Sequence, residues 1–186
     1  MPNEPASAVD LVIRDASLLD HEGRSDIAVS DGVIAAVAPS LDVLASRTID
    51  AAGGLVTTSF IDPHFHLDKA LSRGHFGAVS YQEGFGRARD VKKHFTVADV
   101  ESRVSRALDL AVAQGIGRIR TNVDVDFATR LVSMEGVLRA RDRFRGLIDI
   151  EVIAFPQEGI VTDPEAPDLL RAALDMGADL VGGLPE

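Results

Sequence analysis

The chain has 186 residues, of which 46% are hydrophobic and 26% are charged, an ordinary globular composition with enough apolar material for a core. The formal net charge of −10 at pH 7 opposes phosphate binding, so we expect neither nucleic acid nor a membrane as a partner. There are no cysteines, which leaves histidines and carboxylates as the strong metal ligands. Without an export signal or a long apolar run in the sequence, we expect a cytoplasmic protein.

The first part of the chain has the pattern of short β-strands. Residues 1–8 are polar and contain proline, and we expect a mobile tail there. Asp31-Gly32 lies between the apolar runs 27–29 and 33–37, and it predicts a hairpin because both turn residues tolerate positive φ. The sequence therefore predicts a small sheet ahead of residue 55.

Two histidines follow the apolar run 55–61. Pro63 has no N–H to donate and therefore ends the ladder of the strand before it. On a strand, residues i and i+2 lie on one face about 6.6–7 Å apart, so His64 and His66 can reach one metal ion while Phe65 points the other way. A half-exposed strand produces the same alternation without a metal. A catalytic zinc needs about three protein ligands, so further ligands must come from elsewhere.

The rest of the chain alternates helices and strands. Residues 70–95 form a long connection that either covers the pocket or is a surface excursion. Thr96-Val97-Ala98-Asp99 is a variant capping box that predicts a helix up to Gly115. We expect further strands at 116–125, 148–155 and 178–182, and further helices at 129–145 and 167–176. The connection contains Gly74, Phe76, Gly77, Tyr81, Gly84, Phe85 and Gly86.

Three stretches carry a resemblance to a known family. The chain resembles the first barrel strand of the amidohydrolase superfamily at residues 49–56 and then at Asp62-Pro63-His64-Phe65-His66-Leu67. The chain also resembles cytosine deaminases and isopropylammelide aminohydrolases, at Ala154-Phe155-Pro156-Gln157-Glu158-Gly159 and at Gly182-Gly183-Leu184-Pro185. The resemblance covers nearly the whole chain, in the family's order. It implies a (β/α)8 barrel beside a β-sandwich, of which residues 9–54 would form a part.

The number of strands bears on how much of such a barrel is present. A complete barrel needs eight strands and about 250 residues, whereas 131 residues follow residue 55 (186 minus 55). We therefore expect an α/β fold in which residues 55–186 form the first half of a (β/α)8 barrel, as a fragment or a truncated reading frame. The first and fourth strands would then be unpaired edges, which favour aggregation, self-pairing or pairing with a missing partner segment. Of these we expect self-pairing into a homo-oligomer.

The resemblance also implies a chemistry at the C-terminal ends of the strands, where such barrels carry their sites. His64 and His66 would bind one divalent metal ion, zinc or iron, which lowers the pKa of a bound water to about 7. The implied enzyme is an aminohydrolase acting on a small heterocycle, which is a cyclic amidine, an aminopyrimidine or a triazine-like ring. Hydroxide would attack the carbon that bears the amino group, and ammonia or an amine would leave.

Four other side chains are candidates for the site: Gln157, Lys69, Asp124 and Asn122. Gln157 is implied to bind the substrate, because an amide offers both a donor and an acceptor, although a loop amide can equally serve the backbone. Lys69 resembles a substrate-contacting lysine of the triazine-degrading relatives, although a lysine after a strand is usually solvated, and Asp68 could pair with it locally. Asp124 could bind a ligand, but a structural carboxylate is the simpler interpretation.

The chain departs from the family at several points. Asn122, a substrate-binding candidate, stands where cytosine deaminases usually carry histidine, which argues against cytosine as the substrate, and Ser59 replaces a common glycine. The third metal histidine, the acid/base glutamate, another catalytic histidine and the last aspartate belong to strands beyond residue 186. We therefore expect no catalytic residue within this chain and no activity from it alone. We expect the other histidines at the surface: His21, His75 and His94.

Two other functions remain open. The chain could be a noncatalytic truncated paralogue that acts as a binding module, and a metal-free protein with a defined oligomeric state would favour that interpretation. It could also be a cyclic amidase, such as a hydantoinase or dihydroorotase. Those enzymes usually carry a carboxylated lysine on the fourth strand, and residues 179–183 contain no lysine, which argues against a binuclear site.

Overall fold

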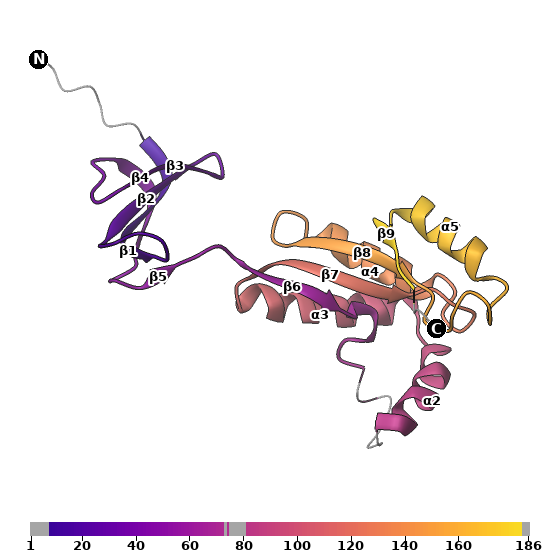
Figure 1. Ribbon diagram of the computed structural model, residues 1–186. Helices are drawn as coiled ribbons and strands as arrows, with labels where there is room; N and C mark the ends of the chain where they lie inside the picture. The colour runs from indigo at the N-terminus through magenta and orange to yellow at the C-terminus, as the bar shows by residue number, and fades with distance from the viewer. Residues whose placement is uncertain (1–7, 73, 75–80, 184–186) are drawn as a thin grey trace, which may run out of the picture. The chain divides into compact units, whose positions relative to one another are not determined.

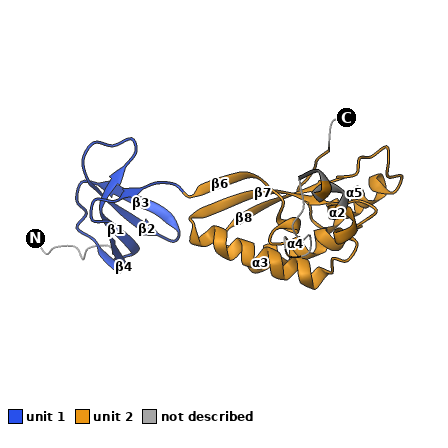
Figure 2. Ribbon diagram, turned by 90° about the horizontal axis from the view of Figure 1, so that it is seen from below, with its two compact units in different colours: residues 1–58 blue, residues 59–186 orange. Residues whose placement is uncertain are grey.

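The computed structural model describes residues 8–72, 74 and 81–183. It divides into two compact units, residues 1–58 and residues 59–186 (Figures 1 and 2). The sequence features that fall outside the described residues are the N-terminal tail 1–7, His75, Phe76, Gly77, Leu184 and Pro185.

Unit 1 is a small sheet whose strands follow the order β3-β2-β1-β4, with β5 also paired to β1. The antiparallel pair β2 and β3 is joined at Asp31 and Gly32, whose φ values of 51° and 74° confirm the predicted hairpin. Leu55 and Val56 pair with β1, so the apolar run 55–61 is divided between the two units. The strands are β1 (Ala8–Leu18), β2 (Ser25–Ser30), β3 (Val33–Ala38), β4 (Leu44–Asp50) and β5 (Leu55–Val56).

A buried carboxylate joins the parts of unit 1. Asp26 accepts hydrogen bonds from the Arg14 guanidinium at 2.5 Å and from the backbone N–H groups of Asp15 and Leu41, each at 3.1 Å. Burial alone raises the pKa of Asp26, but Arg14 and these N–H donors outweigh it, and the pKa lies below its usual value. The ionised Asp26 thus ties the β1–β2 pair to the segment before β4.

Unit 2 contains a parallel sheet with the order β6-β7-β8-β9, and its helices lie between successive strands along the chain. This alternation is that of a partial (β/α)8 barrel, as the sequence predicts. The strands are β6 (Phe60–Phe65), β7 (Ile116–Asp124), β8 (Asp149–Phe155) and β9 (Leu180–Val181). The helices are η1 (Leu67–Lys69), α2 (Tyr81–Lys92), α3 (Val97–Ala113), α4 (Val132–Arg143) and α5 (Ala166–Met176).

The helix signals in the sequence explain where these helices begin and end. The Thr96 hydroxyl accepts a hydrogen bond from the Asp99 N–H at 3.2 Å, which confirms Thr96 as the N-cap of α3, and the Asp99 carboxylate accepts from Arg103. Helix α5 ends at Gly177, whose φ is 113°. Helices α3 and α4 pack closely at Gly136, because a Cβ there would lie 2.7 Å from Val100. None of the helices among the described residues is long and apolar enough to cross a membrane.

The connection between β6 and α3 differs from the expectation of a loop. Within residues 70–95, residues 81–92 form helix α2 despite Gly84 and Gly86. The second half of this helix is rich in arginine, lysine and alanine, which favour helix, and this outweighs the two glycines. The segment that follows the histidines is therefore partly regular structure, with defined side-chain positions near the strand ends.

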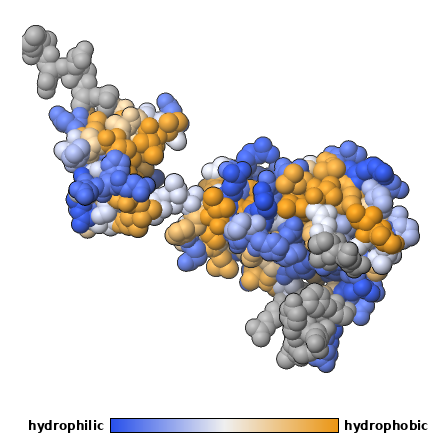
Figure 3. Space-filling model, viewed as in Figure 1, coloured by the Kyte–Doolittle hydropathy of each residue, from blue (hydrophilic) through white to orange (hydrophobic). Residues whose placement is uncertain are grey.

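Apolar side chains remain exposed on both outer strands of the unit 2 sheet. Phe60 and Ile61 on β6 are 62% and 65% exposed, and Leu180 and Val181 on β9 are 44% and 47% exposed. Figure 3 shows apolar surface on unit 2 as well as on unit 1. In the described part of the chain, β6 and β9 each have one strand neighbour, as expected for the ends of a half barrel.

Candidate active-site pocket

The C-terminal ends of β6, β7 and β8 bring most of the predicted site residues together. His66 and Lys69 follow β6, Asp124 ends β7, and Gln157 follows β8. These four side chains line one pocket of about 480 Å³. Because parallel strands end at the same edge of a sheet, residues nearly 90 positions apart in the sequence meet there.

The two histidines lie next to each other. Their ring centroids are 5.4 Å apart with the rings nearly perpendicular, and His66 also packs edge-on against Phe155 at 6.2 Å. His64 is exposed, whereas His66 is half-buried. Asn122 does not line the pocket: its Nδ2 lies 3.5 Å from Nδ1 of His64. The structure thus places Asn122 as a neighbour of His64.

His66 has the properties of a free ligand. Its Nδ1 is buried and has no hydrogen-bond partner among the described residues. Burial and, to a lesser extent, the nearby Lys69 ammonium together lower the pKa of His66 to about 4, so the ring is neutral at pH 7. A neutral imidazole with an unused nitrogen is the form that binds a metal ion.

The pocket also contains a network of charged residues that the sequence reasoning missed. Lys92 of α2 lies 2.7 Å from Asp124 and 2.8 Å from Asp126, and its side chain is 2% exposed. Lys69 pairs with the other oxygen of Asp124 at 2.5 Å, and not with Asp68, the neighbour in sequence that could have paired with it. The sequence feature that could have predicted this network is the pair Asp124 and Asp126 at the end of a strand, because carboxylates that are buried there require a cation as a partner.

Asp68 and Glu158 complete the polar surroundings. Asp68 is fully buried, and its Oδ2 accepts a hydrogen bond from the Asp124 N–H at 3.2 Å. Burial and the charge of Asp124 raise the pKa of Asp68. Glu158 pairs with Arg89 and lies 3.6 Å from Lys92. The pocket therefore has three basic side chains facing several carboxylates.

The residues present fit a divalent metal ion. His66, Asp68 and Asp124 each offer a ligand atom, and these atoms lie within 4.8 Å of one another. Both oxygens of Asp124 are already paired with lysines, which makes it a poor ligand. The unused Nδ1 of His66 and the adjacent exposed ring of His64 are the better donors.

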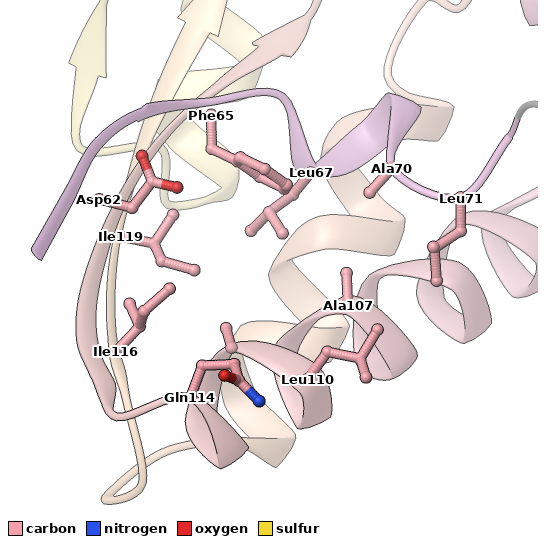
Figure 4. A pocket seen from close by; sticks show the side chains of 11 residues that line it. Asp62, Phe65, Leu67, Ala70, Leu71, Ala107, Leu110, Gln114, Ile116 and Ile119 are labelled. Atoms are coloured by element: carbon pink, nitrogen blue, oxygen red, sulfur yellow. The ribbon is translucent and has the colours of Figure 1, made fainter. Parts of the chain in front are cut away.

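A second pocket, of about 310 Å³, lies beside α3 and is largely apolar. Phe65 and Leu67 line it together with Ile119 and Leu110 (Figure 4). His66 lines the polar pocket and Phe65 the apolar one, so the alternation along residues 64–67 separates ligand chemistry from packing. Of the other histidines, His21 and His94 are exposed, as expected.

Comparisons with known proteins relate the chain to several enzymes. It is 34% identical over 182 residues to the N-isopropylammelide isopropyl amidohydrolase of Pseudomonas sp. (strain ADP), covering 94% of this chain and 45% of that protein. No family model matches it.

Two solved structures are similar to it. The structure of 5-methylcytosine deaminase from Klebsiella pneumoniae, liganded with 5-fluorocytosine, has a TM-score of 0.83 and 31% identity, covering 92% of this chain and 43% of that one. The structure of N-isopropylammelide isopropylaminohydrolase from Burkholderia multivorans has a TM-score of 0.79 and 32% identity, covering 94% and 45%. The chain spans less than half the length of these relatives. Over most of its own length, including the partial barrel and its His-x-His strand, the chain is thus similar to these amidohydrolase-superfamily enzymes.

Proposed function

We propose that this chain forms part of a metal-dependent aminohydrolase that releases ammonia or an amine from an aminopyrimidine- or triazine-like ring. The observation that carries the proposal is the meeting of His66, with its unused Nδ1, and Lys69, Asp124 and Gln157 in one pocket. The relatives support the reaction class, because one is named for removing isopropylamine from N-isopropylammelide and another for deaminating 5-methylcytosine.

His64 and His66 would hold the divalent ion from this chain. Such an ion, when bound, supplies hydroxide at neutral pH by lowering the pKa of water. The low pKa of His66 keeps its ring neutral and ready to bind, and Phe155 restricts the ring's orientation. Asn122 would orient His64 through the contact between their side chains, so its proposed role moves from the substrate to the ligand.

The substrate would be bound by groups that match a ring with adjacent donor and acceptor positions. The Gln157 amide offers one of each. The Lys69 ammonium, paired with Asp124 and partly exposed to the pocket, can donate to a ring oxygen or to an anionic ring nitrogen. Asp124 then holds the Lys69 ammonium in place.

The experiment measures metal content and amine release together. His66→Asn in the 186-residue chain should weaken the affinity for a divalent metal ion by about 100-fold. Substitution even of residues that only support a metal ligand lowers metal affinity by about 10- to 100-fold. His94→Asn, which alters an exposed histidine far from the strand ends in sequence, is the matched control and should bind metal normally. Competition with a chromophoric chelator measures both affinities.

Amine release is then assayed in the complete gene product with N-isopropylammelide, cytosine and related rings. Release that requires added metal and is lost in His66→Asn would support the proposal. A metal-loaded product that releases no amine from any of these rings would overturn it and favour the noncatalytic interpretation. Unchanged metal affinity in His66→Asn would exclude the histidine as a ligand.

A further inference from the structure

Helix α2 is joined to the strand ends by ionic contacts. Lys92, in its last turn, reaches Asp124, Asp126 and Glu158 at 2.7, 2.8 and 3.6 Å. One turn earlier, Arg89 pairs with the same Glu158, and its guanidinium lies 5.7 Å from the centre of the Phe127 ring. Ala88, Arg89 and Lys92 line the polar pocket, so α2 forms one of its walls.

Lys92 differs from the other cations of this wall because it is buried. Its side chain is 2% exposed, whereas that of Arg89 is 52% exposed. Burial by itself lowers the pKa of Lys92, but the Asp124 and Asp126 carboxylates outweigh it, and the pKa lies above its usual value. A buried ammonium that stays charged is expensive to separate from its carboxylates, so this contact resists opening.

Asp124 connects Lys92 to the pocket. It is fully buried, its Oδ2 accepts from Lys92 at 2.7 Å, and its Oδ1 accepts from Lys69 at 2.5 Å. Each ammonium holds one oxygen of the same planar group, so the carboxylate cannot turn toward one lysine without leaving the other. Lys69 is 23% exposed and lines the pocket. The position of the Lys69 ammonium therefore depends on Lys92.

We propose that Lys92 is a positioning residue: it holds one oxygen of Asp124, thereby directs the Lys69 ammonium at the pocket, and fastens α2 as the pocket wall. The consequence for turnover rests on the proposed function. The consequences for Lys69 and α2 rest on ion-pair geometry alone, and they can be measured without any substrate.

The first test compares Lys92→Met with Lys93→Met in the 186-residue chain. Both substitutions remove one positive charge at the C-terminal end of α2, but Lys93 lies one residue beyond the helix, is 49% exposed and pairs at 3.0 Å with Asp90. Lys92→Met should increase hydrogen exchange of the α2 amides by about 10-fold or more, because opening free energies follow the contacts that hold a segment. It should also shift the Lys69 ammonium signal in ¹H–¹⁵N spectra. Lys93→Met should do neither.

Lys92→Arg keeps the positive charge, and it is the variant to measure if Lys92→Met does not fold. Its guanidinium can still pair with Asp124 and Asp126, so α2 exchange should stay close to that of the unsubstituted chain. Because a guanidinium is larger than an ammonium and the Lys92 side chain is buried against Asp124, Asp124 should move and the Lys69 signal should shift. An unchanged Lys69 signal in both Lys92 variants, or in Lys92→Arg where it alone folds, would overturn the proposal.

The second test uses the complete gene product and a substrate on which it releases amine. Lys92→Met should raise KM by about 10-fold and lower kcat less, as expected for a supporting residue. In a Lys69→Met background the same substitution should have no further effect on KM, because its action passes through Lys69. Additive effects would overturn the positioning role. Absence of turnover in the unsubstituted enzyme would refute the proposed function, while the exchange and ammonium measurements would still decide on Lys92.

Discussion

Each unit of the protein contains a buried aspartate paired with a cation, and the two differ in what else holds the carboxylate. Asp26 in unit 1 receives backbone N–H groups of its own unit in addition to Arg14. The carboxylate of Asp124 in unit 2 receives the ammonium groups of Lys69 and Lys92, and it lines a pocket. A carboxylate held by Arg14 and backbone N–H groups of its own unit joins chain segments, whereas one held by two lysine side chains at a pocket can respond to a ligand.

The largest effect is expected from Asp124→Asn. The substitution leaves the buried Lys92 with Asp126 and the more distant Glu158 and removes the carboxylate from Lys69, so the free energy of unfolding of unit 2 should fall by about 3 kcal/mol. The Lys69 ammonium signal should change as well. Urea unfolding and ¹H–¹⁵N spectra measure the two effects; a stability loss without any change at Lys69 would contradict the role assigned to Asp124.

Asp26→Asn provides the contrasting case in unit 1. The amide of the substituted residue cannot accept hydrogen bonds from Arg14, Asp15 and Leu41 as the carboxylate does. The free energy of unfolding of unit 1 should therefore fall by about 2 kcal/mol, the range of hydrogen bonds to charged groups. Metal affinity and the Lys69 signal should remain those of the unsubstituted chain. Hydrogen exchange resolved by unit measures the loss, and a changed metal affinity would show that Asp26 is more than structural.

Gly182→Ala tests the packing behind His66. A Cβ at Gly182 would lie 2.8 Å from the Phe155 ring, which packs edge-on against His66, so the ring must shift. We expect the free energy of unfolding to fall by about 1 kcal/mol and the metal affinity to weaken. Gly183→Ala is the matched control, because a Cβ there meets no atom within 4 Å. Equal metal affinities in the two variants would show that Phe155 does not position His66.

The smallest effect is the pH dependence of the metal-free protein. His66 has a pKa of about 4 when folded and about 6.5 when unfolded, so between these values the unfolded chain binds more protons. The stability of unit 2 should therefore fall as the pH drops through this window. Asp68 opposes this, because its raised pKa makes the folded state bind more protons above pH 3.8.

Unit 1 should be unaffected in the same window, because the pKa of Asp26 is lowered and its contribution is lost only below pH 3.8. Urea unfolding at about pH 7 and about pH 5, after chelator treatment, measures the two units. His66→Asn should remove the fall in unit 2; a fall that persists in this variant would assign it to another group.

The sequence alone determined the local features of both units. The hairpin at Asp31-Gly32 and the helix N-cap at Thr96 are short-range signals, and each appears where it was expected. The succession of strands and helices predicted the partial barrel, and His-x-His at a strand end placed two adjacent imidazoles. These features depend on backbone preferences and periodicity within a few residues, which any sequence shows directly.

Only the tertiary structure decided how the charged side chains pair. The Lys92–Asp124 contact joins residues 32 positions apart, and it requires both α2, which was expected as a loop, and the register that brings Asp124 level with Phe155. Lys69 bonds to Asp124 although Asp68 is its neighbour in sequence. Long flexible side chains can reach many partners, and burial selects among them through the cost of leaving a charge unpaired. That selection depends on distances that no local pattern contains.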